Sequence, residues 1–149
     1  MRKAAILTTL LAATFSVATS APTSARAATL KLVERATGNA THVHGGSAPD
    51  NVGDILTFSN PVYDETNSKK LGLDQGYCVR LVVGVAYECH WTLSIAAGQL
   101  SVDGPFLDAG DSTLAVTGGT GAFSTARGQM HLHARDAKGS AYDYIYELK

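Results

Sequence analysis

The sequence predicts an all-β fold that begins after an N-terminal export segment. Beyond residue 27, apolar residues recur mostly at every second position, which is the period of a strand, and nowhere keep the helical period of 3.6. Glycine and other turn-forming residues interrupt these runs at short, regular intervals. Because no helix is expected to cover a sheet face, an antiparallel sandwich and a closed barrel are the two architectures that fit.

Residues 1–27 have the features of a secretory signal peptide. A short basic start precedes the apolar stretch Ile6–Val17, and Ala25-Arg26-Ala27 is an A-x-A cleavage pattern, although a cut after Ser20 stays open. The apolar stretch is shorter than the roughly 20 residues that a membrane span needs. We therefore expect a secreted, extracellular protein whose mature part, residues 28–149, forms a single domain.

Eight strands are predicted in the mature part, separated by segments rich in turn-forming residues. The longest of these segments, Gly38–Gly53, is expected to be a loop. The predicted strands are Thr29–Ala36, Asp54–Tyr63, Gln75–Val83, Ala86–Ile95, Gln99–Phe106, Ser112–Thr117, Ser124–Ala134 and Ser140–Leu148.

The two cysteines lie on either side of the tightest turn, near Val83-Gly84. A two-residue loop there would place Val82 opposite Val85, and Cys78 opposite Cys89 on the same face of the sheet. In an exported protein this arrangement predicts a disulfide between Cys78 and Cys89. Two buried free thiols are the alternative.

Charge and motifs argue against several classes of partner. The formal net charge is −1, with no block of like charges, so the chain lacks the basic face that nucleic acid requires. For the same reason, no membrane contact is expected of the mature protein. The pairs His42/His44 and His131/His133 have a spacing that zinc sites use. Nothing in the sequence brings the two pairs together, so neither a metal site nor a cofactor is predicted.

Six short segments follow one another along the chain, namely Gly53–Asn60, Tyr63-Asp64, Lys69–Gly72, Gly76–Val79, Leu100–Leu107 and Leu114–Gly121. Their order and spacing closely resemble those of plant allene oxide cyclases. The segment Gly118–Phe123, with Ala126-Arg127-Gly128 after it, is similar to the related dirigent proteins. Both families belong to one superfamily of eight-stranded barrels, so the resemblance, over residues 53–148, implies a closed antiparallel β-barrel.

The resemblance also implies an apolar lumen that confines a reactive molecule while it cyclises, with water excluded. Carried over by position, Glu34 and Asn60 are the predicted catalytic residues, acting at the polar end of the substrate. The predicted substrate-binding residues are Phe58, Cys78, Trp91 and Phe106. Phe106 replaces a tyrosine of the plant cyclases and so lacks its hydroxyl.

These observations favour a barrel that binds a small hydrophobic or phenolic molecule and directs its stereoselective cyclisation or isomerisation. Such a protein would be an isomerase, an intramolecular cyclase. The similarity to dirigent proteins adds phenolic coupling, with Arg127 as a candidate polar anchor. A non-catalytic binding or defence module with the same cavity is the alternative, and a lumen plugged by side chains is a third. Both families commonly form trimers, so a homotrimer is a further expectation.

Overall fold

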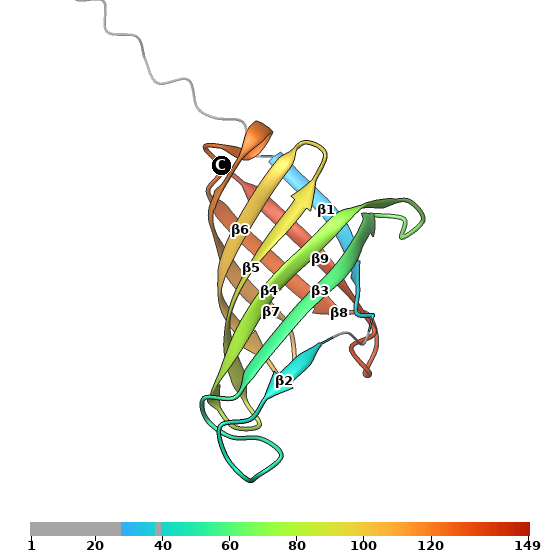
Figure 1. Cartoon of the computed structure of the whole chain (residues 1–149). Helices are drawn as coiled ribbons and strands as arrows, with labels where there is room; N and C mark the ends of the chain where they lie inside the picture. The colour runs from blue at the N-terminus through green and yellow to red at the C-terminus, as the bar shows by residue number, and fades with distance from the viewer. Residues whose placement is uncertain (1–27, 38–39) are drawn as a thin grey trace, which may run out of the picture.

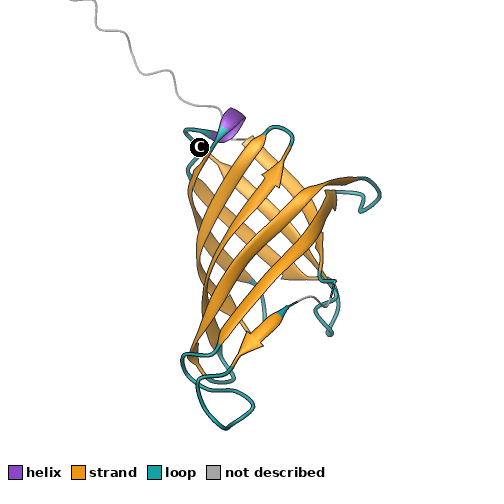
Figure 2. Cartoon of the chain, in the orientation of Figure 1, coloured by secondary structure: helices purple, strands orange, loops and turns teal. Residues whose placement is uncertain are grey.

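The computed structural model describes residues 28–37 and 40–149, and the regular elements in this part of the chain are all strands apart from one 3-10 turn (Figure 2). The predicted signal peptide, residues 1–27, lies outside the described residues. Within them, no helix is long and apolar enough to cross a membrane. The elements are β1 (Ala28–Arg35), β2 (Thr41–Val43), β3 (Ile55–Asp64), β4 (Lys70–Val82), β5 (Ala86–Ile95), β6 (Gly98–Leu107), β7 (Ser112–Gly119), the 3-10 turn η1 (Gly121–Phe123), β8 (Gly128–Ala134) and β9 (Ala141–Leu148).

Eight of the strands close into an antiparallel barrel (Figure 1). From β3 to β9 each strand pairs with the next one along the chain, and β1 pairs with both β9 and β3. The closing contact with β3 places Val33 opposite Tyr63. The predicted fold class is therefore confirmed, and the sandwich is excluded.

The structure adds one strand to the eight predicted. β2 lies within the predicted loop Gly38–Gly53 and pairs only with the first part of β3, where Thr41 lies opposite Thr57. β1 pairs with the last part of the same strand. Two strands therefore share one edge of β3, with β2 along its first part and β1 along its last part. β1 belongs to the closed barrel, whereas β2 is an additional strand.

Strand boundaries differ from prediction at two places and agree closely elsewhere. β4 begins at Lys70 instead of Gln75, which adds Gly72 and Asp74 to the inward-facing row of this strand. β8 begins at Gly128 instead of Ser124, because η1 and the residues after it form the connection between β7 and β8.

The β4–β5 turn has three residues, Val83–Val85, rather than two. Gly84 has φ +69°, a conformation that glycine adopts without a steric penalty. An irregularity between Arg80 and Val82 absorbs the extra residue, so Val82 lies opposite Ala86. The predicted pairing of Val82 with Val85 is wrong, whereas Cys78 lies opposite Cys89 as predicted.

Apolar side chains fill the barrel toward the β5–β6 turn and the C-terminal end of β9. Val62, Leu93, Leu100, Val102 and Tyr146 are all fully buried there. Side chains pack this half of the lumen, and the remaining space lies toward the opposite end.

Candidate functional site

A cavity of about 360 Å³ occupies the part of the lumen that the core leaves open. Its wall comes from β1, β2, β3, β4, β5, β6, β8 and β9, with contributions from the segment before β2 and from the β8–β9 turn. A lumen completely plugged by side chains does not fit this structure. All six residues predicted for catalysis or substrate binding lie in the wall, namely Glu34, Phe58, Asn60, Cys78, Trp91 and Phe106.

The alternation of side chains along a strand brings these residues to one side. On β3, Leu56, Phe58 and Asn60 are two positions apart and all three line the cavity. On β4, Gly76 lies opposite Trp91 of β5. A Cβ atom at Gly76 would come within 2.4 Å of the Trp91 Cβ, so only glycine accommodates this approach.

Aromatic rings form much of the wall. Phe58 meets Trp91 edge to face with ring centroids 6.0 Å apart, and Trp91 stacks on Tyr144 at 5.9 Å. Phe106 meets Tyr142 edge to face at 6.0 Å. Tyr142 thus brings a phenol to the part of the wall where Phe106 itself has none. These rings present apolar, rigid surfaces to whatever occupies the lumen.

Glu34 forms the polar centre of the wall, and its side chain is only 2% exposed. Its Oε1 accepts a hydrogen bond from the Asn60 amide nitrogen, while Oε2 has no hydrogen-bond partner among the described residues. The backbone N–H and the hydroxyl of Thr37 both donate to the Asn60 Oδ1 at 3.2 Å. Because its oxygen is held in this way, Asn60 turns its amide donor toward Glu34.

Burial raises the pKa of Glu34 to about 7, and the hydrogen bond from Asn60 opposes this shift without cancelling it. A carboxyl group with a pKa near neutrality can both give and accept a proton at physiological pH. Glu34 therefore has the properties of a general acid or base that faces an apolar space.

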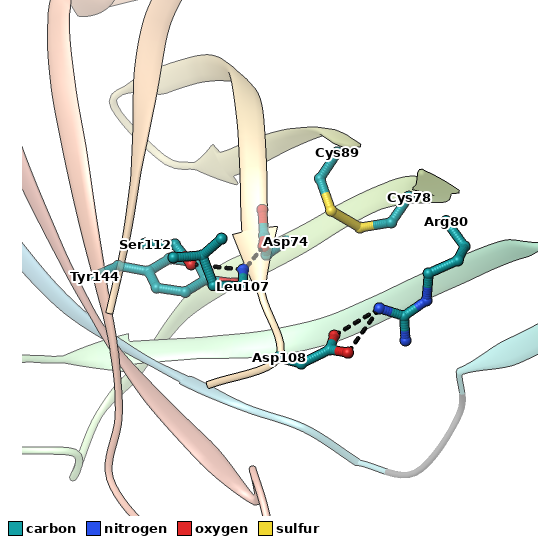
Figure 3. Close-up of a disulfide and its surroundings, with 8 residues drawn as sticks. All are labelled: Asp74, Cys78, Arg80, Cys89, Leu107, Asp108, Ser112 and Tyr144. Atoms are coloured by element: carbon teal, nitrogen blue, oxygen red, sulfur yellow. Dashed lines mark hydrogen bonds and ion pairs between the residues drawn. A yellow bond between two sulfur atoms is a disulfide. The ribbon is translucent and has the colours of Figure 1, made fainter. Parts of the chain in front are cut away.

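Asp74 is a second buried carboxyl of the lumen, which the sequence-based prediction missed. It lies on β4 directly opposite Asn60, is 0% exposed, and accepts a hydrogen bond from the Tyr144 hydroxyl at 3.1 Å (Figure 3). Counting back in twos from Cys78 through Gly76 places Asp74 on the inward face. The predicted strand began one residue too late to include it.

A disulfide joins Cys78 to Cys89, whose Cα atoms are 4.0 Å apart, so the predicted bridge is confirmed (Figure 3). The alternative of two free thiols is excluded, since neither cysteine is free. Both cysteines are buried, and Cys78 contributes to the cavity wall. The bridge therefore fixes β4 against β5 beside the Trp91 side of the lumen.

Arg80 lies on β4, two residues beyond Cys78, and links this strand to two neighbouring connections of the barrel. Its Nη1 donates to both carboxylate oxygens of Asp108 at 2.7 Å (Figure 3). Its Nε donates to Asp50 at 2.9 Å. The guanidinium also lies 3.6 Å from the centroid of the Tyr87 ring. Burial disfavours its charge, but these partners outweigh that effect and raise the pKa of Arg80. Arg80 thereby ties β4 to the loop before β3 and to the β6–β7 turn.

The remaining candidate groups lie away from the polar centre. His42 lines the cavity, whereas His44 contacts Asp54 at 2.8 Å. His131 and His133 bond to partners on the barrel exterior, and among residues 28–37 and 40–149 no group of three or more potential ligands could hold a metal ion. Arg127 does not line the cavity, and its guanidinium donates to the Ala126 carbonyl oxygen at 2.7 Å.

Comparison with known proteins gives one family and several structural neighbours. The family model described as allene oxide cyclase matches residues 28–136. A pyocyanin demethylase is 23% identical with a TM-score of 0.70, over 82% of this chain and 100% of that one. The pterocarpan synthase dirigent protein PsPTS1 is 19% identical with a TM-score of 0.64, over 83% and 93%. The Diels–Alderase AbmU from Streptomyces koyangensis is 12% identical with a TM-score of 0.62, over 85% and 71%. These three likenesses concern the fold.

Proposed function

This chain belongs to the allene oxide cyclase family, and from that premise we propose that it is a secreted barrel that binds a small hydrophobic or phenolic molecule in its lumen. The barrel directs the stereoselective cyclisation or isomerisation of this guest. The observation that carries the proposal is the buried Glu34, which faces an apolar cavity with a pKa of about 7 and one oxygen without a partner among the described residues.

The cavity suits confinement of one small guest. Its volume of about 360 Å³ is within the range of roughly 300–1,000 Å³ that is usual for small-molecule sites. Rigid rings of Phe58, Trp91 and Tyr144 restrict the conformations that a guest adopts against them. Restricting the guest to one folded conformation favours one face of ring closure over the other. A solved structure with the same fold is described as a Diels–Alderase, which supports the assignment of ring formation.

Glu34 supplies the proton chemistry in this proposal. In its neutral form it donates a proton or a hydrogen bond to an oxygen of the guest on which negative charge develops, and it recovers the proton when the product forms. Asn60 holds the other carboxyl oxygen, so the free oxygen stays turned to the guest. The apolar wall keeps water away from the reactive species, which suppresses competing hydrolysis.

The proposal places the mature protein outside the cell. The disulfide between Cys78 and Cys89 supports this placement, because such bridges persist in oxidising compartments. Assembly as a homotrimer is part of the proposal and is testable by light scattering on the mature protein.

The function is tested with a freshly generated allene oxide and, in parallel, with a phenoxy radical that couples without a catalyst. Chiral chromatography gives the enantiomeric excess of each product. We expect an excess with the wild type and a loss of at least tenfold in catalysed rate with Glu34→Gln, which keeps the size of the side chain. Glu88→Gln, an exposed residue on β5, is the matched control and is expected to retain the excess.

Racemic product from the wild type with both probes contradicts cyclase and coupling activity on these substrate classes. If the wild type and Glu34→Gln bind the guests equally and neither changes the product, the non-catalytic binding module replaces the proposed function. Fluorescence of Trp91, the single tryptophan and part of the cavity wall, reports binding independently of turnover.

A further inference from the structure

Asp74 is the most deeply buried acid of the lumen, and the mechanism above does not use it. It is 0% exposed and does not line the cavity, whereas Tyr144, which donates a hydrogen bond to it, does. Its Oδ2 accepts the hydrogen bond from the Tyr144 hydroxyl, and its Oδ1 has no hydrogen-bond partner among the described residues. The neighbours opposite it in the sheet are Asn60 and Leu93, and neither is charged.

This environment disfavours a charged carboxylate. Within the described part of the chain, the groups that act on Asp74 include no cation, and transferring an ionised carboxylate into such a site without a counter-ion is costly. The groups that face it are Glu34 from β1, Tyr144 and Tyr146 from β9, and the backbone N–H of Gln75. Burial is the largest cause that raises the pKa of Asp74 well above its ordinary value, and the charge of Glu34 raises it further.

Glu34 and Asp74 have different access to donors and to the guest. Glu34 borders the cavity, and the Asn60 amide donates a hydrogen bond to it. Asp74 is enclosed, and the Tyr144 hydroxyl offsets only part of the cost of burying its charge. When two carboxyl groups share one apolar space, the first charge settles on the better-stabilised group and opposes the second. As the pH rises, Glu34 is therefore the first of the two carboxyl groups to lose its proton.

We propose that Asp74 is a positioning residue that forms an acid pair with Glu34, in which Asp74 keeps its proton throughout while Glu34 exchanges its own with the guest. Asp74 acts through Tyr144, whose ring it holds against Trp91 in the cavity wall. The charge that forms on Glu34 in turn helps to keep Asp74 protonated. The inference rests on the proposed function for the role of Glu34, but the pairing itself is measurable without any substrate.

The test follows the side-chain carboxyl carbons of the mature, disulfide-bonded protein by ¹³C NMR as the pH is raised. In the wild type we expect Glu34 to titrate near pH 7 and Asp74 to titrate at higher pH. In Glu34→Gln, the midpoint of Asp74 moves down by about one pH unit or more, because the opposing charge is gone. In Asp74→Asn, the midpoint of Glu34 stays near 7, because Asp74 is neutral when Glu34 ionises.

Glu88→Gln serves as the control for removing a carboxylate far from the lumen and is expected to leave both midpoints in place. Tyr144→Phe is a second, independent variant. Loss of its hydroxyl removes a hydrogen bond that favours the charged carboxylate, so the midpoint of Asp74 rises while Glu34 stays near 7. The contact of Asp74 with Tyr144 thus remains testable if Glu34→Gln does not fold. A purely structural role for Asp74 would predict no movement of its midpoint in Glu34→Gln.

An Asp74 carboxyl that titrates below pH 5 in the wild type overturns the proposal, as does one whose midpoint is the same with and without Glu34. Either result leaves the proposed function standing if Glu34→Gln abolishes the enantiomeric excess. Conversely, if no guest is converted but the midpoints move as described, the acid pair stands and the proposed function fails.

Discussion

Gly76 has no side chain at the point where Trp91 of the neighbouring strand comes closest to it. A Cβ atom there would lie 2.3 Å from the His90 carbonyl oxygen and 2.7 Å from the Trp91 Cα, so backbone as well as side chain would have to move. The aromatic wall that Trp91 forms with Phe58 and Tyr144 depends on this close approach.

Gly76→Ala is expected to lower the free energy of unfolding by about 1–3 kcal/mol, the usual cost of overpacking a core position. Urea unfolding followed by circular dichroism measures the change. Gly118→Ala is the matched control in a strand, because the nearest atom to a Cβ there is an Arg127 nitrogen at 3.8 Å. Equal losses in the two variants would show that the contact with Trp91 is not the cause.

The sequence predicts which side chains face the lumen only where the start of the strand is predicted correctly. Glu34, Asn60 and Phe58 were assigned to the lumen from a family resemblance, and the structure places all three in the cavity wall. Asp74 was missed because a charged residue beside a predicted turn gives no signal of burial. Its partner Tyr144 is 70 positions away, and only closure of the barrel brings the two together.

Among the elements, the β4–β5 hairpin combines a three-residue turn with a disulfide between its two strands. The irregularity after Arg80 changes the pairing near the turn, but the register is restored before Cys78. A slip of one residue would have turned the cysteines to opposite faces. The disulfide therefore fixes the register of two strands that both contribute to the cavity.

Replacing both cysteines, as Cys78→Ala with Cys89→Ala, is expected to lower the free energy of unfolding by about 3 kcal/mol, because the unfolded chain regains the freedom of the closed loop. Guanidinium unfolding with and without a reductant measures it. Reductant should reproduce the loss in the wild type and leave the double variant unchanged. A loss below about 0.5 kcal/mol would mean that strand pairing alone restrains these residues.

The loop before β3 illustrates an element that local sequence does not predict. Asp54 accepts hydrogen bonds from the backbone N–H groups of Gly45 and Asn51 at 2.7 Å and 2.9 Å. Arg80, which lies on β4, donates a hydrogen bond to Asp50 of the same loop. These contacts order a segment rich in glycine and asparagine and bring β2 to the edge of β3. The contact between Arg80 and Asp50 joins residues 30 positions apart, and local propensity does not reflect such a contact.

For the whole molecule, a buried acid in the lumen makes stability depend on pH. The pKa of Glu34 is raised from 4.5 to about 7, so between these values the folded protein binds a proton that the unfolded chain has released. Stability from this group is complete below pH 4.5 and falls as the pH rises through 7. Asp74 acts in the same direction, since burial raises its pKa as well.

Glu34→Gln is therefore expected to raise the free energy of unfolding at pH 8 by about 3 kcal/mol and to leave it nearly unchanged at pH 4, because a tenfold change in proton affinity corresponds to about 1.4 kcal/mol. Thermal unfolding from pH 4 to pH 8 measures the effect. Glu65→Gln removes an exposed glutamate that contacts Lys31 at 3.1 Å and should have a small effect at every pH. Parallel curves for wild type and Glu34→Gln would contradict a raised pKa for Glu34.

The sequence by itself determined the class of fold, because the period of apolar residues and the positions of turns are local properties of the chain. The order of its segments also identified the family. The positions of Cys78 and Cys89 on either side of a single tight turn predicted the disulfide between them. Only the tertiary structure decided that the lumen holds two buried acids and that β2 joins the edge of β3. Both features arise from contacts between distant strands, and the strength of a buried charge depends on everything that surrounds it in space.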